Sequence, residues 1–277
     1  MAHANAVTSP TEVPRDQWGR PLVVPERGGK PVAYTRVSTL SKQLDNGNAL
    51  AAWKQRMTAL GLARRPDLMA LVQSLDVTAK NELDQICEQA LEHAGGTSRA
   101  NLGTALHSIF EQADKGNPPA ILEALLAQHL QSYRTAIEIA GLTPAASERF
   151  VVCDELQVAG TFDRIYRTRD NQLVIGDIKT GDTANTYGLG AVQIQTACYA
   201  AGRTYDPATG SRGPALSELG VSREWAVLVH SPYGSGSCTI YRLDLEQGWA
   251  DAQLASKVHR RTAATRKWAA APYSEGS

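Results

Sequence analysis

The sequence predicts a mixed α/β fold, with an α+β mixed sheet core that follows a helical N-terminal region. Apolar residues recur at helical spacing up to about residue 140, as at Trp53, Met57 and Leu60. After Pro144 the pattern changes to short runs rich in β-branched residues, which are typical of strands. The chain has 277 residues, 43% of them hydrophobic and 20% charged, and this length and composition suit a globular protein with a substantial core.

The N-terminal region divides into an arm and a series of helices. Residues 1–32 are rich in Pro and Gly with little periodicity, and they predict an extended or disordered arm. We expect one domain over 33–277, with a mainly helical part at 33–142 and a sheet core at 143–277. Helices are predicted over 35–63 (as a pair), 66–75, 78–94, 98–115 and 120–140. Glycine or proline follows most of these segments, as expected at helix ends.

The sheet core is predicted to contain five strands and two helices. The strands are expected at 149–156, 158–168, 173–180, 224–230 and 238–243, and the helices at 185–205 and 245–269. The linker from Arg169 to Gln172 is rich in turn residues, so the second and third strands should form a hairpin.

The third strand ends in an acid and a base two positions apart. Asp177 and Lys179 would share one face of the strand, about 6.6 Å apart along it. The hairpin would bring Asp163 beside them, and two carboxylates that close are unfavourable unless a cation lies between them. The pattern therefore predicts a divalent metal site made of oxygen ligands, with a lysine beside it. The alternative is an ordinary strand end that meets solvent, so the motif gains weight only from further features.

Two helices supply those features. His107 lies one turn after Gly103 on the helix at 98–115, where the missing side chain of the glycine permits a close approach. On the helix at 185–205, Gln195 and Tyr199 are four residues apart and share a face. Each feature alone is compatible with a solvated or core position.

The four motifs together resemble a known nuclease family. Gly-Thr-Ala-Leu-His107, Gly-Thr-Phe-Asp163, Asp177-Ile-Lys179-Thr-Gly and Gln195-Thr-Ala-Cys-Tyr199 resemble the nuclease module of the RecB family. That family belongs to the PD-(D/E)XK superfamily, and the stand-alone RecB-like exonucleases of bacteriophages are the most similar branch. The resemblance covers about 107–199 and implies a PD-(D/E)XK, restriction-endonuclease-like core.

The resemblance also implies roles for these residues. Asp163 and Asp177 would be catalytic carboxylates that bind the metal, and the backbone carbonyl of Ile178 and the ring of His107 would be further metal ligands. Lys179 would orient or activate the attacking water.

The resemblance implies roles for further residues that lie before Asp163 and after Lys179 in the sequence. Gln195 and Tyr199 would hold the nucleic-acid strand. Many relatives carry a further metal-binding glutamate on the strand before the hairpin, for which Glu148 is preferred here and Glu155 is the alternative.

The expected cofactor is Mg²⁺ or Mn²⁺, which activates water and neutralises charge on the phosphate. Mg²⁺ prefers carboxylate and carbonyl oxygens, and the histidine suggests that Mn²⁺ is also accepted. Some relatives hold an iron–sulfur cluster through one early and three closely spaced late cysteines. The cysteines here are Cys87, Cys153, Cys198 and Cys238, so no iron–sulfur cluster is expected. No ATP-binding motif is present, because Pro31 follows Gly28-Gly29-Lys30 where a hydroxyl residue would be required.

The distribution of charge and the hydropathy of the chain indicate which partners it could bind. The net charge is zero, but five bases and no acid lie between Ser256 and Trp268, which fits a polyanion such as DNA approaching that side. No apolar run is long enough to span a bilayer, and the first residues lack the order of a secretory signal, so we expect no membrane partner and a cytoplasmic location.

The sequence leaves three functions open. The leading one is a metal-dependent DNA exonuclease in phage recombination or DNA processing, with a separate recombination or single-strand annealing protein as a possible partner. The alternatives are an endonuclease of the same fold and a non-catalytic DNA-binding protein.

Overall fold

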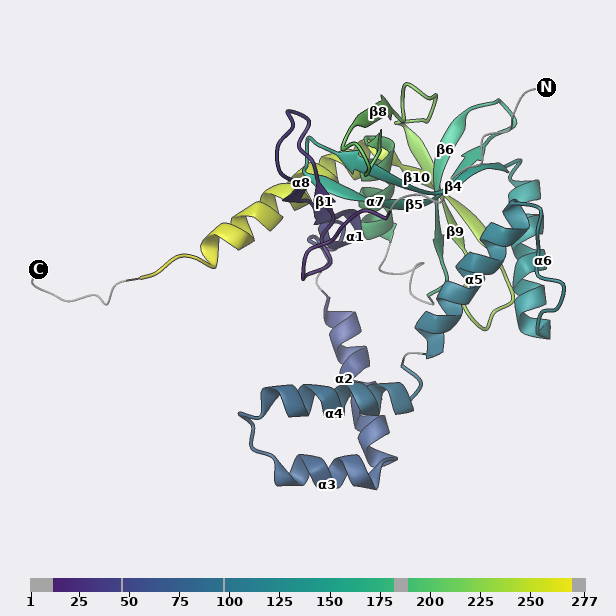
Figure 1. Ribbon diagram of the computed structural model, residues 1–277. Helices are drawn as coiled ribbons and strands as arrows, with labels where there is room; N and C mark the ends of the chain where they lie inside the picture. Colours follow the sequence, from purple (N-terminus) through teal and green to yellow (C-terminus); the bar gives the residue numbers. More distant parts are fainter. Residues whose placement is uncertain (1–11, 46, 97, 182–188, 271–277) are drawn as a thin grey trace, which may run out of the picture.

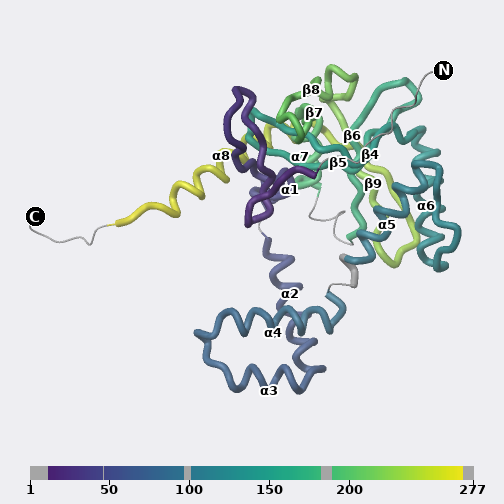
Figure 2. The backbone as a smooth tube through the Cα atoms, viewed as in Figure 1, coloured from purple at the N-terminus to yellow at the C-terminus, as the bar shows by residue number. Residues whose placement is uncertain are grey.

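The computed structural model describes residues 12–45, 47–96, 98–181 and 189–270. A mixed sheet lies between two layers of helices, and a separate group of helices extends away from it (Figures 1 and 2). The strands are β1 (Leu22–Val23), β2 (Val32–Ala33), β3 (Thr35–Arg36), β4 (Thr143–Cys153), β5 (Val158–Arg167), β6 (Leu173–Lys179), β7 (Arg203–Tyr205), β8 (Arg212–Ala215), β9 (Trp225–His230) and β10 (Thr239–Asp244). The helices are α1 (Val37–Leu40), α2 (Asn48–Ala63), α3 (Pro66–Ser74), α4 (Lys80–His93), α5 (Ser98–Asp114), α6 (Ala124–Ile139), α7 (Leu189–Ala200) and α8 (Leu245–Thr265).

The predicted mixed α/β class is confirmed, and so is the hairpin of β5 and β6. These strands are antiparallel, and Thr168 N donates to Gln172 O at 2.9 Å across the turn. The helix expected over 185–205 is wrong at its end, because α7 stops at Ala200 and the chain continues into β7. Gly202 N donates to Tyr199 O in the turn that ends the helix, and Arg203 then pairs with Val152. Residues 185–188 of that expected helix lie outside the described residues.

The arm expected to be extended or disordered is packed over its described part. Strands β1 and β2 pair with each other, and the side chains of Val13 and Val23 are buried. Val24 N donates to Tyr205 Oη at 3.1 Å, which fastens the segment to β7. The short apolar run at Leu22 and Val23 supplies this packing, because each buried aliphatic side chain stabilises the folded state. Residues 1–11 lie outside the described residues.

The main sheet has eight strands in the order β10-β9-β6-β5-β4-β7-β8, with β3 pairing the start of β5. Its two faces follow from the alternation of side chains along β6. Ile175 packs in the apolar cluster that contains α7 and α8, whereas Val174 and Ile178 pack in the cluster that contains α5 and α6. By the same alternation, Asp177 faces α7.

The alternation breaks once on β5, at Asp163 and Arg164. Phe162 and Ile165 are three residues apart, yet both pack in the cluster on the α7 face. In a regular strand, residues two apart point to the same face and residues three apart point to opposite faces. The in-and-out alternation of side chains is therefore shifted by one residue between Phe162 and Ile165. Glu148, which lies opposite Asp163 in the β4–β5 register, has a φ of 49°, a left-handed value that only a few per cent of non-glycine residues adopt. The irregularity turns the Arg164 side chain toward α5.

Helices α2, α3 and α4 form the separate group, here called the helical module. Leu68, Ile86 and Ala90 are its buried core. Helices α2 and α4 touch at Gly61, where an added Cβ would stand 1.9 Å from Ala90 O. Within the described parts of the chain, no helix combines the length and apolar character that a bilayer crossing needs.

Candidate active site at the end of the central hairpin

Asp177 lies at the carboxyl end of β6, and 1% of its surface is exposed. The last pair of the β5–β6 ladder is Arg164 with Gly176, and Asp163 and Asp177 are the next residues beyond that pair on their two strands. The Lys179 ammonium is paired with Asp177 Oδ2, and Gln195 Nε2 donates to Asp177 Oδ1 at 2.9 Å. Burial raises the pKa of Asp177 to about 6, Lys179 opposes that rise, and the nearby Asp163 adds to it. The hairpin therefore brings the two acids and the lysine together, as the sequence predicted.

Asp163 connects the two strands to helix α5. Its Oδ2 accepts a hydrogen bond of 2.8 Å from Ile178 N and lies 3.8 Å from His107 Nδ1. Burial lowers the pKa of His107, and the Asp163 carboxylate and a hydrogen bond to the backbone of Ile178 partly oppose that decrease. The ring of His107 thus lies beside Asp163 and Ile178, two of the four residues that were expected to share a metal with it.

Helix α5 can approach β6 because of Gly103. A Cβ at this position would stand 2.6 Å from Thr180 Oγ1, closer than real Cβ atoms come to their neighbours. The close approach inferred from this glycine is confirmed, and it places His107 one turn later at the site.

Behind the site lies a buried polar network that the sequence pattern did not predict. Arg164 is fully buried, and its Nε donates to Asp114 Oδ2 at 2.7 Å. Tyr133 Oη donates to the same carboxylate at 2.9 Å and lies 3.0 Å from Tyr166 Oη. Arg164 Nη1 also donates to the backbone carbonyl of Asp163 at 2.8 Å. The pattern Asp163-Arg164 in an otherwise apolar strand was the available signal, since a buried strand rarely carries an arginine without a partner.

Of the two glutamates considered, Glu148 lies near the site. It faces Asp163 across the β4–β5 pair, and its Oε1 is 3.8 Å from Arg164 Nη1. Burial raises the pKa of Glu148 to about 7, and the nearby charges of Asp163 and Glu111 contribute to that rise. Glu155 lies in the turn between β4 and β5, where it accepts a hydrogen bond from Gln253 of α8. The geometry therefore favours Glu148 as the third carboxylate.

Gln195 and Tyr199, the two residues predicted to hold the nucleic-acid strand, lie on the face of α7 that meets the sheet. Tyr199 is only 4% exposed, and its ring meets Phe162 edge-on with a centroid distance of 6.5 Å. Gln195 donates to Asp177 and, at 3.4 Å, to Tyr199 Oη. The small part of Tyr199 that reaches the surface offers little area for a base or sugar. The pair supports Asp177 from the α7 side.

The residues fit a hard divalent cation with oxygen ligands. Asp177 Oδ2 is buried and accepts no hydrogen bond of good geometry, although it is in contact with the Lys179 ammonium. Over 12–45, 47–96, 98–181 and 189–270, no three His, Cys, Asp or Glu side chains lie close enough to hold an ion by themselves. Mg²⁺ does not require such a cage, because it is commonly bound by one or two carboxylates, waters and substrate phosphates.

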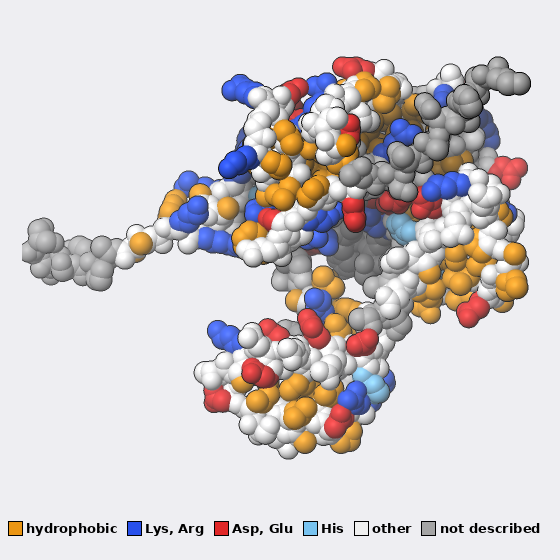
Figure 3. Space-filling view, in the orientation of Figure 1, with side chains coloured by type: hydrophobic (Ala, Val, Ile, Leu, Met, Phe, Trp, Pro, Cys, Tyr) orange, Lys and Arg blue, Asp and Glu red, His pale blue; other side chains and the backbone are white. Residues whose placement is uncertain are grey.

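The surface of the molecule is hollowed between the sheet and the helical module. Acidic side chains and a histidine lie at the edge of this hollow (Figure 3).

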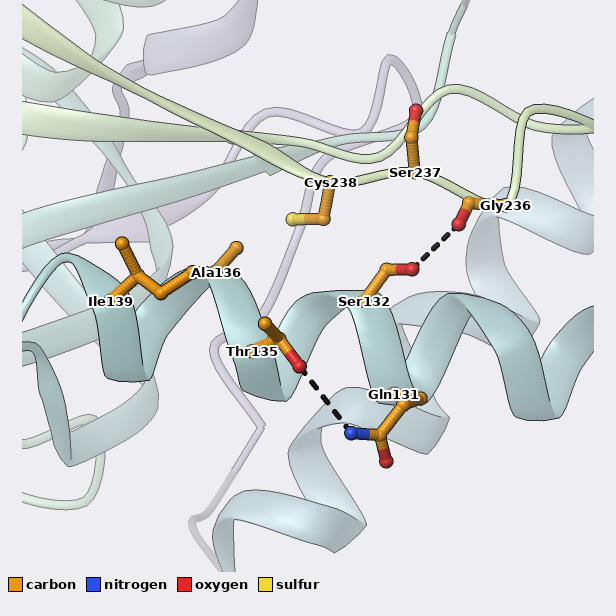
Figure 4. Close-up of a pocket in the computed structure, with 8 residues that line it drawn as sticks. All are labelled: Gln131, Ser132, Thr135, Ala136, Ile139, Gly236, Ser237 and Cys238. Carbon is orange, nitrogen blue, oxygen red and sulfur yellow. Dashed lines mark hydrogen bonds between the residues drawn. The ribbon is translucent and has the colours of Figure 1, made fainter.

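A pocket and the four cysteines are not part of the site described above. A shallow pocket elsewhere, between α6 and the segment before β10, is lined by uncharged residues, with Ser132 Oγ donating to Gly236 O (Figure 4). The cysteines lie on different segments, Cys87 in α4, Cys153 in β4, Cys198 in α7 and Cys238 before β10.

A family model described as the PD-(D/E)XK nuclease superfamily matches residues 80–274, which include every residue of the site described above. A search of curated proteins found no match to the chain.

Proposed function

The chain belongs to the PD-(D/E)XK nuclease superfamily, and from this membership and the site geometry we propose that it is a metal-dependent exonuclease that hydrolyses DNA. The observation that carries the proposal is the meeting of Asp163, Asp177 and Lys179 at one end of the central hairpin. Two carboxylates that face a lysine at a partly open strand end suit the binding of a cation and a phosphate together.

Each residue has a distinct proposed role. Asp163 and Asp177, with the backbone carbonyl of Ile178, would hold Mg²⁺ or Mn²⁺ together with water and a substrate phosphate. His107 and Glu148 would be further ligands, which have to move closer to the two aspartates when the ion binds. The ion supplies a water of lowered pKa and charge neutralisation at the phosphate.

Lys179 orients the attacking water and stabilises negative charge on the phosphate. Its pKa is raised, because the attraction of Asp177 and Asp163 outweighs the effect of burial, so the side chain stays protonated. A protonated lysine cannot accept the proton of the attacking water, so its role is electrostatic rather than that of a base.

The exonuclease assignment rests on the four RecB-like motifs and is tested with two forms of one DNA. Purified protein with Mg²⁺ is incubated with linear and covalently closed circular DNA of the same sequence. We expect loss of the linear form alone. Loss of both forms would make the protein an endonuclease. Loss of neither, with Mn²⁺ tested as well, would favour the non-catalytic DNA-binding alternative.

The finer assignments of the proposal come from the same motifs. Action in phage DNA recombination or processing, in the cytoplasm of the host and beside a single-strand annealing protein, follows from the likeness to stand-alone phage exonucleases. We also propose that the protein carries no iron–sulfur cluster, because its cysteines lie on separate segments. Elemental analysis of the purified protein that found four irons per chain would contradict this.

A further inference from the structure

The last turns of α8 and the residues after them form a strongly basic surface, here called the α8 basic end. Its exposed bases are Lys257, Arg260, Arg261, Arg266 and Lys267, and no acid occurs between residues 252 and 270. The net charge of the whole chain is zero, so the positive charge is local. A local cluster of positive charges attracts polyanions even when the protein has no net charge.

The first half of α8 is fixed to the site through α7, and its second half projects. Gly248 allows α8 to approach α7 so closely that an added Cβ would stand 2.6 Å from Gln193 O, two residues before Gln195. The C-terminal half extends beyond the sheet, with Lys and Arg side chains gathered on it (Figures 1 and 3). The basic end is therefore a rigid continuation of an element that packs beside the site.

The distance from the site follows from the strand register. His259 Nε2 of α8 lies 3.3 Å from Thr35 Oγ1, and Thr35 pairs with Val158 of β5. Asp163 is five residues further along β5, which corresponds to roughly 17 Å. The first bases of the α8 basic end thus begin about 20 Å from the carboxylates, a span of about six base pairs at 3.4 Å per step.

One contact orders the end of this surface. The guanidinium of Arg261 lies over the ring of Trp268, 4.8 Å from its centroid, although 66% of the tryptophan surface is exposed. A cation–π contact stabilises this arrangement even at an exposed site. The charge of Arg261 therefore has a defined position facing solvent.

We propose that the α8 basic end binds the DNA phosphate backbone about six base pairs away from the bond that is cleaved. This inference rests on the proposed nuclease function, which supplies DNA as the partner. Complementarity between a local run of bases and a phosphate backbone supports it. The surface then acts as a second contact that holds long DNA while the ends are processed at the site.

The test uses two matched double variants of the full chain. Arg260→Gln with Arg261→Gln removes two charges from the α8 basic end. Arg134→Gln with Arg167→Gln removes two exposed charges from α6 and from the end of β5, away from α8. Binding to a duplex of about 30 base pairs is measured from about 50 to 200 mM salt, with Asp177→Asn added to every protein so that the DNA stays intact.

The proposal expects a different salt dependence for the two variants. The slope of log K against log salt should fall in magnitude by about 2 for the α8 variant, because each lost phosphate contact removes about one released counterion. The control should keep the slope of its parent. Equal slopes for the α8 variant and its parent would overturn the proposal and leave this surface to some other acidic partner.

Cleavage of long and short DNA separates this proposal from the nuclease assignment. With Asp177 intact, the unmodified protein should have a KM at least about 10-fold lower on a duplex of about 30 base pairs than on a hairpin duplex with a stem of about 4 base pairs, because the short stem ends before it reaches α8. The α8 variant should lose that preference and the control should keep it. Absence of cleavage by the unmodified protein on either duplex would instead refute the nuclease assignment, and a preference retained by the α8 variant would refute only the role of α8.

Discussion

Arg164 holds the backbones of Asp163 and His107 at the same time. Its Nη1 donates to Asp163 O at 2.8 Å, and its Nη2 reaches His107 O at 3.5 Å. One residue belongs to β5 and the other to α5, so this single guanidinium joins the strand and the helix that supply the site. The Asp114 carboxylate compensates for the burial of its charge. We therefore regard Arg164 as a positioning residue of the proposed reaction.

Replacement of Arg164 should separate stability from positioning. Arg164→Met leaves the Asp114 carboxylate buried without its charged partner, which should lower the free energy of unfolding by about 3–5 kcal/mol. The double variant with Asp114→Asn should recover much of that loss, yet its cleavage rate should stay low because methionine cannot donate to the two carbonyls. Urea unfolding and cleavage rates measure the two effects. Near-normal turnover in the double variant would reduce Arg164 to a structural role.

The sequence predicted the helices and strands well, but it did not predict that Arg164 is buried and joins β5 to α5. The hairpin and the meeting of Asp163, Asp177 and Lys179 follow from strand periodicity and a turn-rich linker, which are local signals. The shift in side-chain alternation at Asp163 and the left-handed φ of Glu148 depend on packing between segments that are distant in the sequence. No local pattern reports such packing.

The same limit applies to the face of α7 that carries Gln195 and Tyr199. A spacing of four predicts that Gln195 and Tyr199 share a face, which is correct, but it does not tell which neighbour that face meets. The structure directs Gln195 toward the Asp177 carboxylate and leaves Tyr199 in the core.

Asp177→Asn should abolish cleavage while the protein remains folded. The amide has the size of the carboxylate but lacks the charge that a divalent ion requires. Lys179→Met should lower kcat by about 10²–10³-fold, the usual cost of removing one group that stabilises transition-state charge. Single-turnover assays measure both, with Asp170→Asn in the exposed hairpin turn as the control. Metal-dependent activity retained in Asp177→Asn would contradict the metal-site assignment.

Gln195→Leu should shift the acidic limb of the pH–rate profile to higher pH. Gln195 donates a hydrogen bond to the Asp177 carboxylate, and loss of a donor to the charged form raises the pKa of an acid. The variant should therefore lose more activity at about pH 6 than at about pH 8. A strand-binding glutamine would behave differently, since its loss would raise KM for DNA by a similar factor at both pH values.

His129 should make the protein less stable as the pH falls. The ring is buried, Nδ1 lies 2.8 Å from Ser231 Oγ, and burial lowers the pKa of His129. Below the unfolded pKa of about 6.5, unfolding takes up a proton that the folded state binds less readily, so stability is lost as pH falls through that value. Urea unfolding from about pH 7 to 5 should show a shallower loss for His129→Gln than for the unmodified protein. The exposed His93→Gln is the control, and an equal loss in all three proteins would contradict the assignment.

His107 should act as a metal ligand rather than as a core residue. Its ring must be neutral to bind an ion, and burial lowers the pKa of His107, so the neutral form prevails near pH 7. The carboxylates would still hold some metal without it. We therefore expect His107→Ala to be impaired at low Mn²⁺ and partly restored at high Mn²⁺, with a melting temperature close to that of the unmodified protein. The measurement is activity against Mn²⁺ concentration for both proteins, alongside thermal unfolding without metal. A variant that melts early and whose residual activity does not respond to Mn²⁺ would show that His107 serves packing between α5 and β6, and that the site uses oxygen ligands alone.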